Sequence, residues 1–368
     1  MRKLCIFHPA RHFRGAKFPL FALFTVSLSL SGCSPDSANN KHTTETQQKP
    51  IAMVTDFAQF TAENYKNRCD EDYASTETLY QRIAKGKYEG DDQVLLHNIN
   101  ELDRQLDNAL GGNGLFSNVH PDADVREAAE ACQKRFVSLL SEISLSRPIY
   151  DQIAAVDTAT FDEIDTRFVE DRLRDLRRAG VNLDDAGRAT VKQLNDDILQ
   201  LGQTFGKNIR EDVRTLTIES VDTLQGLPQD YIDAHPADED GRITLTTNYP
   251  DYYPAMQYAE NDAFRLAFYK TFRKRAHPQN ESILRALLEK RYTLARLLSY
   301  DNYADYITET LMIQSPDKAQ RFIDKIDAIA QNKAQQEYDQ LLEKLQQEDP
   351  SASSVGDWQK TYLAEQIK

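Results

Sequence analysis

The sequence predicts a mainly α-helical protein, a multi-helix domain with one small antiparallel β-ribbon. Apolar residues recur every three or four positions through successive segments, which is the spacing of one face of a helix. Alternation with a period of two, which is typical of strands, occurs only at 215–221 and 243–246. We expect these two short stretches to pair with each other.

Three helices are predicted first along the chain. One covers 57–84 and ends before a break marked by two glycines. The next keeps helical spacing over 95–110 and is expected to end at the glycine-rich segment 111–114. Asp122 or Asp124 is expected to cap the third, because a side-chain oxygen there accepts hydrogen bonds from first-turn amides.

Later helices follow the same apolar spacing. Pro254 is expected in the first turn of the helix that follows the ribbon, where a missing amide hydrogen costs nothing. The helix near residue 200 has its predicted buried face at Val191, Leu194, Ile198, Leu201 and Phe205. Further helices are expected at 147–156, 160–179, 184–209, 316–347 and 358–368.

The most informative stretch is Ile283–Asp317. It predicts two amphipathic helices joined by a tight connection at Leu298-Ser299-Tyr300, with a stop at Ser315-Pro316. The apolar face of its first helix is formed by six leucines, Leu284, Leu287, Leu288, Leu294, Leu297 and Leu298.

As a residue string, this stretch resembles the thimet oligopeptidase and neurolysin family of zinc metallopeptidases, the M3 group. That family usually has glycine where this chain has Ser299. Four further segments are similar to family motifs and occur in family order: Phe116–Asp122 with Val125–Ala129, Leu173–Val181, Asn208–Asp212 and Tyr249–Pro254. The resemblance implies the fold of the N-terminal half of a neurolysin-like protein.

The family cleaves peptides with an H-E-x-x-H motif that holds zinc and activates water. None of the seven histidines of this chain is followed by glutamate; they are His8, His12, His42, His97, His120, His235 and His277. We therefore predict no catalytic, cofactor-binding or metal residue on this chain. Zinc is expected only for the complete family enzyme, whose catalytic half would continue beyond Lys368.

Two functions remain open. The resemblance implies a lipid-anchored zinc metallo-oligopeptidase that hydrolyses short peptides, of which this chain supplies one wall of the substrate channel and is inactive alone. Its partners would be short peptides and a missing C-terminal catalytic half, whether the sequence is truncated or the gene is split. The alternative is a non-catalytic helical envelope lipoprotein that binds peptides or a partner protein.

The N-terminus predicts export and lipid attachment. Residues 1–32 combine a basic start, an apolar run and small residues before Cys33, which resembles the cleavage box of bacterial lipoproteins. A lipid on Cys33 would anchor the chain in the cell envelope, and Ser34 is consistent with the outer membrane, facing the periplasm. The polar segment 33–54 is expected to be a disordered tether, and 55–368 the helical domain.

Charge and cysteine usage agree with an exported protein. The net charge of −14 falls to −19 without residues 1–32, because 39 basic residues then face 58 acidic ones. Nucleic acid would be repelled. Once Cys5 is removed with the leader and Cys33 is lipidated, Cys69 and Cys132 remain, and we predict a disulfide between them rather than two buried thiols.

Three other polar patterns favour structural interpretations. His97 and Glu101 lie four residues apart on one helix and could share a metal, but such a pair is usually a surface contact. The glycines at 111–114 lack the lysine and the preceding strand of a phosphate loop. The acidic turn 238–241 lacks the closing glutamate of a calcium loop.

Overall fold

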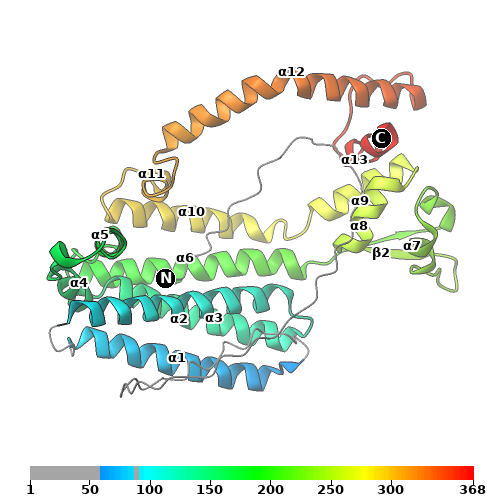
Figure 1. Cartoon of the computed structure of the whole chain (residues 1–368). Coiled ribbons are helices and arrows are strands. Elements are labelled where there is room, and N and C mark those ends of the chain that lie inside the picture. The colour runs from blue at the N-terminus through cyan, green and yellow to red at the C-terminus, as the bar shows by residue number, and fades with distance from the viewer. Residues whose placement is uncertain (1–58, 87–90) are drawn as a thin grey trace, which may run out of the picture. The chain divides into compact units, whose positions relative to one another are not determined.

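The computed structural model describes residues 59–86 and 91–368, so the predicted leader, Cys33 and the tether lie outside it. Thirteen α-helices and one two-stranded antiparallel sheet occupy the described residues, which confirms the mainly α fold class (Figure 1). Within those residues, no helix combines the length and the apolar character needed to cross a membrane.

Helices α1 (Ala62–Ala84), α2 (Asp92–Val119) and α3 (Ala123–Ser144) pack on one another and are called the N-terminal bundle. Each begins at a side chain that accepts hydrogen bonds from first-turn amides, at Thr61, Asp91 and Asp122. Buried side chains from all three helices form one core, including Ile83, Ile99, Leu102, Leu106, Ala129, Phe136 and Ile143.

The predicted end of the second helix at 111–114 is wrong, because α2 continues to Val119. Asn113 is buried, and the hydroxyl of Tyr65 on α1 donates a hydrogen bond of 2.6 Å to its side-chain oxygen. Phe116 packs in an aromatic cluster with Phe60 and Tyr65, with ring centroids 5.1 Å away in each case. These contacts outweigh the low helix propensity of glycine, about 1 kcal/mol per residue.

The next helices cover the bundle. They are α4 (Arg147–Ala154), α5 (Glu163–Ala179) and α6 (Asp185–Glu211), with a short 3₁₀ turn, η2, at Thr158–Thr160. Helix α4 contacts α1 and α5, and α6 packs along α3. Gly180 ends α5 in the left-handed conformation, with φ of 102°, as is common at helix C-termini.

A small β module follows α6. Strands β1 (Thr215–Ile218) and β2 (Ile243–Thr246) pair antiparallel, as the sequence predicts, with Thr215 opposite Thr246. Strand β1 is shorter than the predicted 215–221, because the 3₁₀ turn η3 already begins at Val221. The elements η3 (Val221–Leu224) and α7 (Gln229–Asp233) connect them, and α8 (Tyr249–Tyr258) and α9 (Asp262–Arg273) come next.

The prediction for Pro254 is wrong, because α8 begins five residues earlier, at Tyr249. Pro250 occupies the first turn instead, and Pro254 lies inside the helix. The residues Tyr252, Ala255 and Met256 bury this helix against the β module, so packing holds the segment helical through the proline.

Helix α10 (Gln279–Leu297) packs along α6, and α11 (Tyr303–Thr308) follows it. Ser299 in the connection has φ of 70°, a left-handed conformation that glycine adopts more easily. Arg178 of α5 holds α11 in place, because it pairs with Glu309 and donates a 2.6 Å hydrogen bond to the carbonyl of Tyr306.

The last elements are α12 (Pro316–Glu348) and α13 (Lys360–Ile367). The C-terminal end of α12 is packed, where Leu345 joins Tyr362 and Leu363 of α13 in a small core, and its N-terminal end contacts α11. Helix α13 in turn packs on α8. The eighteen residues 320–337, called the exposed segment of α12, are all exposed.

Candidate functional site

The histidines that the sequence singles out lie on separate elements. His97 and Glu101 are on α2, but Glu101 accepts hydrogen bonds from Arg104 (2.7 Å from Nε) and from Gln105 (2.9 Å). The hydrogen bond from Arg104 is the main reason that the pKa of Glu101 lies below its ordinary value. Glu101 therefore takes part in a surface ion pair.

His120 follows α2 and is only 3% exposed. Its ring stacks on Phe116 with centroids 5.7 Å apart, and its Nδ1 accepts a 3.1 Å hydrogen bond from the amide of Asp122. These contacts fix the connection between α2 and α3, at the motif that carried part of the family resemblance.

His235 and Asp251 form a half-buried pair in the β module. The Nε2 of His235 lies 3.2 Å from Oδ1 of Asp251, whose other oxygen accepts hydrogen bonds from the amide (2.9 Å) and hydroxyl (2.6 Å) of Thr246. Burial by itself would raise the pKa of Asp251, but these hydrogen bonds together hold it below its ordinary value. The pair joins α7, β2 and α8.

His277 is exposed and lies 2.9 Å from Glu281 in a surface pair. Asp238 in the acidic turn accepts hydrogen bonds from the amides of Asp240 (3.0 Å) and Arg242 (2.9 Å), so its carboxylate closes the turn. No group of three or more His, Cys, Asp or Glu side chains within residues 59–86 and 91–368 is arranged to hold a metal ion.

Cys69 of α1 and Cys132 of α3 are joined by a disulfide in the structure, with Cα atoms 6.1 Å apart. Both residues are buried in the core of the N-terminal bundle. This is the pair for which the sequence predicts a disulfide.

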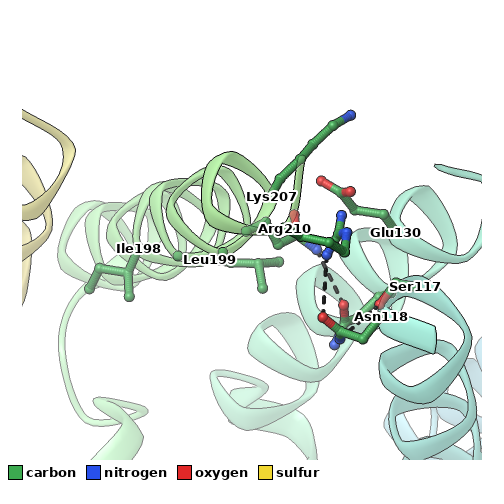
Figure 2. A pocket seen from close by; sticks show the side chains of 11 residues that line it. Ser117, Asn118, Glu130, Ile198, Leu199, Lys207 and Arg210 are labelled. Carbon is green, nitrogen blue, oxygen red and sulfur yellow. Dashed lines mark hydrogen bonds between the residues drawn. The ribbon is translucent and has the colours of Figure 1, made fainter. Parts of the chain in front are cut away.

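Two pockets in the described part of the chain share lining residues on α6. The first, called the polar pocket after its charged and amide residues, has a mostly apolar surface and a volume of about 370 Å³, and it lies between α6, α3 and the end of α2 (Figure 2). Lys207, Arg210 and Glu130 are its charged residues. Its other lining residues are Ser117, Asn118, Gln133, Ile198, Leu199, Gly202, Gln203 and Gly206.

The second, called the apolar pocket, also has a volume of about 370 Å³ and lies between α3, α6, α10 and α11. It shares Ile198 and Leu199 with the polar pocket, so the two form one depression along α6, called the α6 groove. Most of its other lining residues are apolar: Val137, Leu140, Leu145, Ala179, Val191, Leu294 and Leu298.

The sequence does not predict the α6 groove. Its apolar spacing places Ile198 on the buried face, whereas this side chain is half-buried and lines both pockets. Gly202 and Gly206 are the feature of the sequence that could have indicated the groove, because glycines four residues apart lie on one helix face and leave it without side chains. A Cβ at either position would meet nothing within 4 Å, so the two glycines face open space.

Exposed apolar side chains lie on α10 and on α12, and together they are called the exposed apolar surface. Two of the six leucines predicted to form one apolar face, Leu284 and Leu288, are 44% and 55% exposed, whereas Leu287 and Leu294 are buried. On α12 the side chains of Phe322, Ile323, Ile326 and Ile329 are each about half or more exposed. Exposed apolar residues at helical spacing are typical of an interface.

Comparison with known protein families gives two matches along the chain. Residues 77–188 match the model of the neurolysin/thimet oligopeptidase N-terminal domain, and residues 255–368 match the model of peptidase family M3. The first match begins near the end of α1 and runs through α5 to the start of α6, and the second begins inside α8 and includes α12.

Individual relatives agree with these matches. The chain is 24% identical to organellar oligopeptidase A of Arabidopsis thaliana over 67% of its own length and 34% of that protein. It is 25% identical to saccharolysin of Saccharomyces cerevisiae over 73% of its length and 39% of that protein. It is 24% identical to oligopeptidase A of Escherichia coli over 66% of its length and 38% of that protein. The chain thus spans less than two fifths of these relatives.

Proposed function

Because the chain belongs to peptidase family M3, we propose that it is the helical, non-catalytic part of a zinc-dependent oligopeptidase that hydrolyses short peptides. The order of the two family matches supports this assignment, since the N-terminal-domain model precedes the peptidase model along a single helical unit. The relatives named oligopeptidase support a peptide substrate.

In this proposal the zinc site lies in a part of the enzyme that the present sequence does not contain. Zinc would hold and activate the attacking water there. No histidine of this sequence is followed by glutamate, and the described residues hold no cluster of metal ligands. The role left to this chain is to bind and orient the peptide and to shield it from bulk water.

The exposed apolar surface supports the presence of a covering part. Within the described residues, Leu288 on α10 and Ile326 on α12 have no apolar neighbours that bury them, and the relatives extend beyond the part that this chain matches. In this proposal the catalytic part packs on that surface.

The test is an activity and metal assay on the purified 368-residue chain. We expect no cleavage of a quenched fluorogenic peptide and no stoichiometric zinc by elemental analysis. Cleavage that a chelator abolishes would overturn the proposal for this chain. An immunoblot of the native host then distinguishes a product smaller than 42.0 kDa, the mass of the chain with its leader, from a longer enzyme.

The site of action in this proposal is the periplasmic face of the outer membrane, with a lipid on Cys33. Incorporation of labelled palmitate tests the anchor, and Cys33→Ser should remove the label and release the protein from membranes. Cys5→Ser is the matched control, because this residue lies in the leader and should leave labelling unchanged.

A further inference from the structure

We propose that the α6 groove is a peptide-binding site, in which the apolar pocket takes a hydrophobic side chain and the polar pocket takes the C-terminal carboxylate. The choice of a peptide over another amphipathic carboxylate rests on the proposed function. The groove itself is defined by the residues of α3, α6 and α10, and its binding can be measured without any catalytic step.

The length of the groove fits a short extended segment. On α6 the lining residues run from Val191 in the apolar pocket to Arg210 in the polar pocket. Nineteen residues of helix span about 28 Å. An extended peptide advances about 3.3 Å per residue, so five residues with the carboxylate at Arg210 would reach about as far as Leu199, which lines both pockets.

Arg210 is the group best suited to receive the carboxylate. Its Nη1 donates a 3.3 Å hydrogen bond to the side-chain oxygen of Asn118. Its Nε is buried without a hydrogen-bond partner, so a carboxylate would reach this atom only if neighbouring side chains moved. Figure 2 shows Arg210 and Glu130 at the same end of the pocket. A carboxylate can take two parallel hydrogen bonds from a guanidinium, which gives orientation as well as affinity.

The remaining charges around the pocket do not by themselves favour an anion. Lys207 and Arg210 against Glu130 leave the lining at +1, but Glu127 and Glu211 beside Lys207 bring the local sum to −1. The Nζ of Lys207 is already shared with Glu127 (3.6 Å) and Glu211 (3.9 Å). Glu130 should therefore weaken carboxylate binding, and Arg210 should contribute most to it.

Amide side chains along the groove suit a peptide backbone. Gln203 donates a hydrogen bond of 3.4 Å to Gln133 across the gap between α6 and α3, a long contact that leaves both amides further capacity. Asn195 of the apolar pocket donates to the hydroxyl of Ser141 at 3.2 Å. Side-chain amides both donate and accept, as backbone peptide groups require.

The two glycines offer a way to fill the groove without disturbing the fold. A side chain at Gly206 would enter the polar pocket, because nothing lies within 4 Å of the added Cβ. Gly112 on α2 is equally open, exposed and helical, but it does not line either pocket. Replacing either glycine also raises helix propensity.

The test measures binding of labelled pentapeptides to the purified chain by fluorescence anisotropy, with a chelator present. The peptides end in Ala, Val, Leu, Phe or Lys and carry either a free or an amidated C-terminus. We expect the Leu and Phe peptides to bind best, and amidation to weaken them at least about tenfold. Failure of every peptide to bind below about 1 mM would overturn the site.

Variants locate the binding. We expect Arg210→Gln to weaken the free-acid peptide at least about tenfold, and Glu130→Gln to strengthen it by about two- to fivefold. Gly206→Leu should abolish binding, whereas Gly112→Leu should leave it unchanged. Equal binding by the Gly206→Leu protein would place the peptide elsewhere and end the proposal.

Two further outcomes separate this inference from the proposed function. Direct binding of labelled decanoate with no binding of any peptide would identify a fatty-acid site and overturn the peptide assignment. Peptide binding lost in Gly206→Leu, in a chain that cleaves no peptide, would support both proposals. Cleavage by the chain alone would overturn the proposed function and leave the groove to be judged by the binding data.

Discussion

The N-terminal bundle and the exposed segment of α12 are both built from amphipathic helices, yet only the bundle has partners for its apolar residues. Phe136 on α3 is 1% exposed, whereas Phe322 on α12 is 57% exposed. The apolar residues of α12 recur at helical spacing just as those of α3 do. Amphipathic spacing therefore indicates which face of a helix is apolar, but not whether other residues of this chain cover that face.

The largest expected effect on stability is the difference between substitutions at Phe136 and at Phe322. Phe136→Ala should lower the free energy of unfolding by about 3–5 kcal/mol, because it leaves a cavity in the bundle core. Phe322→Ala is the matched control and should change it by less than about 0.5 kcal/mol. Urea unfolding followed by circular dichroism measures both. Equal losses would mean that α12 is covered in solution.

The disulfide should strengthen the bundle alone. Cys69 and Cys132 are 63 residues apart, so in the chain-entropy model their bond contributes up to about 4 kcal/mol. We expect the Cys69→Ala, Cys132→Ala double variant to unfold at lower urea concentration, with the exposed segment of α12 unaffected. Alkylation of two thiols in the native, non-reduced protein would contradict the bond.

A smaller loss is expected in the β module. Asp251→Asn should destabilise the fold by about 1–3 kcal/mol, because Thr246 and His235 lose their charged acceptor. The pKa of Asp251 is lowered in the folded state, so its contribution is present above its unfolded pKa and lost as pH falls through the folded value. The difference between wild type and variant should thus shrink below about pH 4. An undiminished difference at low pH would exclude this ionisation as its source.

The smallest effect on stability should come from Ile326→Glu in the exposed segment of α12, at less than about 0.5 kcal/mol. The same change at Leu345, on the packed end of that helix, should destabilise the α12–α13 core, where truncation alone costs about 2 kcal/mol or more. Ile326→Glu should instead reduce self-association and binding of an apolar dye. Unchanged dye binding would show that this face is not the accessible apolar surface.

Much of the fold could be predicted because most segments follow a local rule. Apolar spacing located the helices, period-two alternation located β1 and β2, and Asp122 caps α3 as expected. The predicted helix end at 111–114 was wrong because a residue distant in sequence, Tyr65, holds this segment in the helix through its hydrogen bond to Asn113. The spacing of apolar residues within one segment does not tell which helices contact each other.

The α6 groove was harder to predict than the fold. Its lining comes from α2, α3, α5, α6, α10 and α11, so no single segment carries a motif for it. Arg210 belongs to a segment that resembles a family motif, but that resemblance gives no role for its side chain. Only the packing of α6 on α3 brings Arg210 next to Asn118 and Glu130.

The exposed segment of α12 should make the chain sensitive to hydrogen exchange and to proteolysis at this helix. Eighteen helical residues without tertiary support are only marginally stable in water, so their amide hydrogens should exchange with deuterium far sooner than those of α2. Arg321, Lys325 and Lys333 lie within this segment. Trypsin should therefore cleave the chain first after these three residues. Protection of those peptide bonds from trypsin would indicate that another molecule is bound to α12.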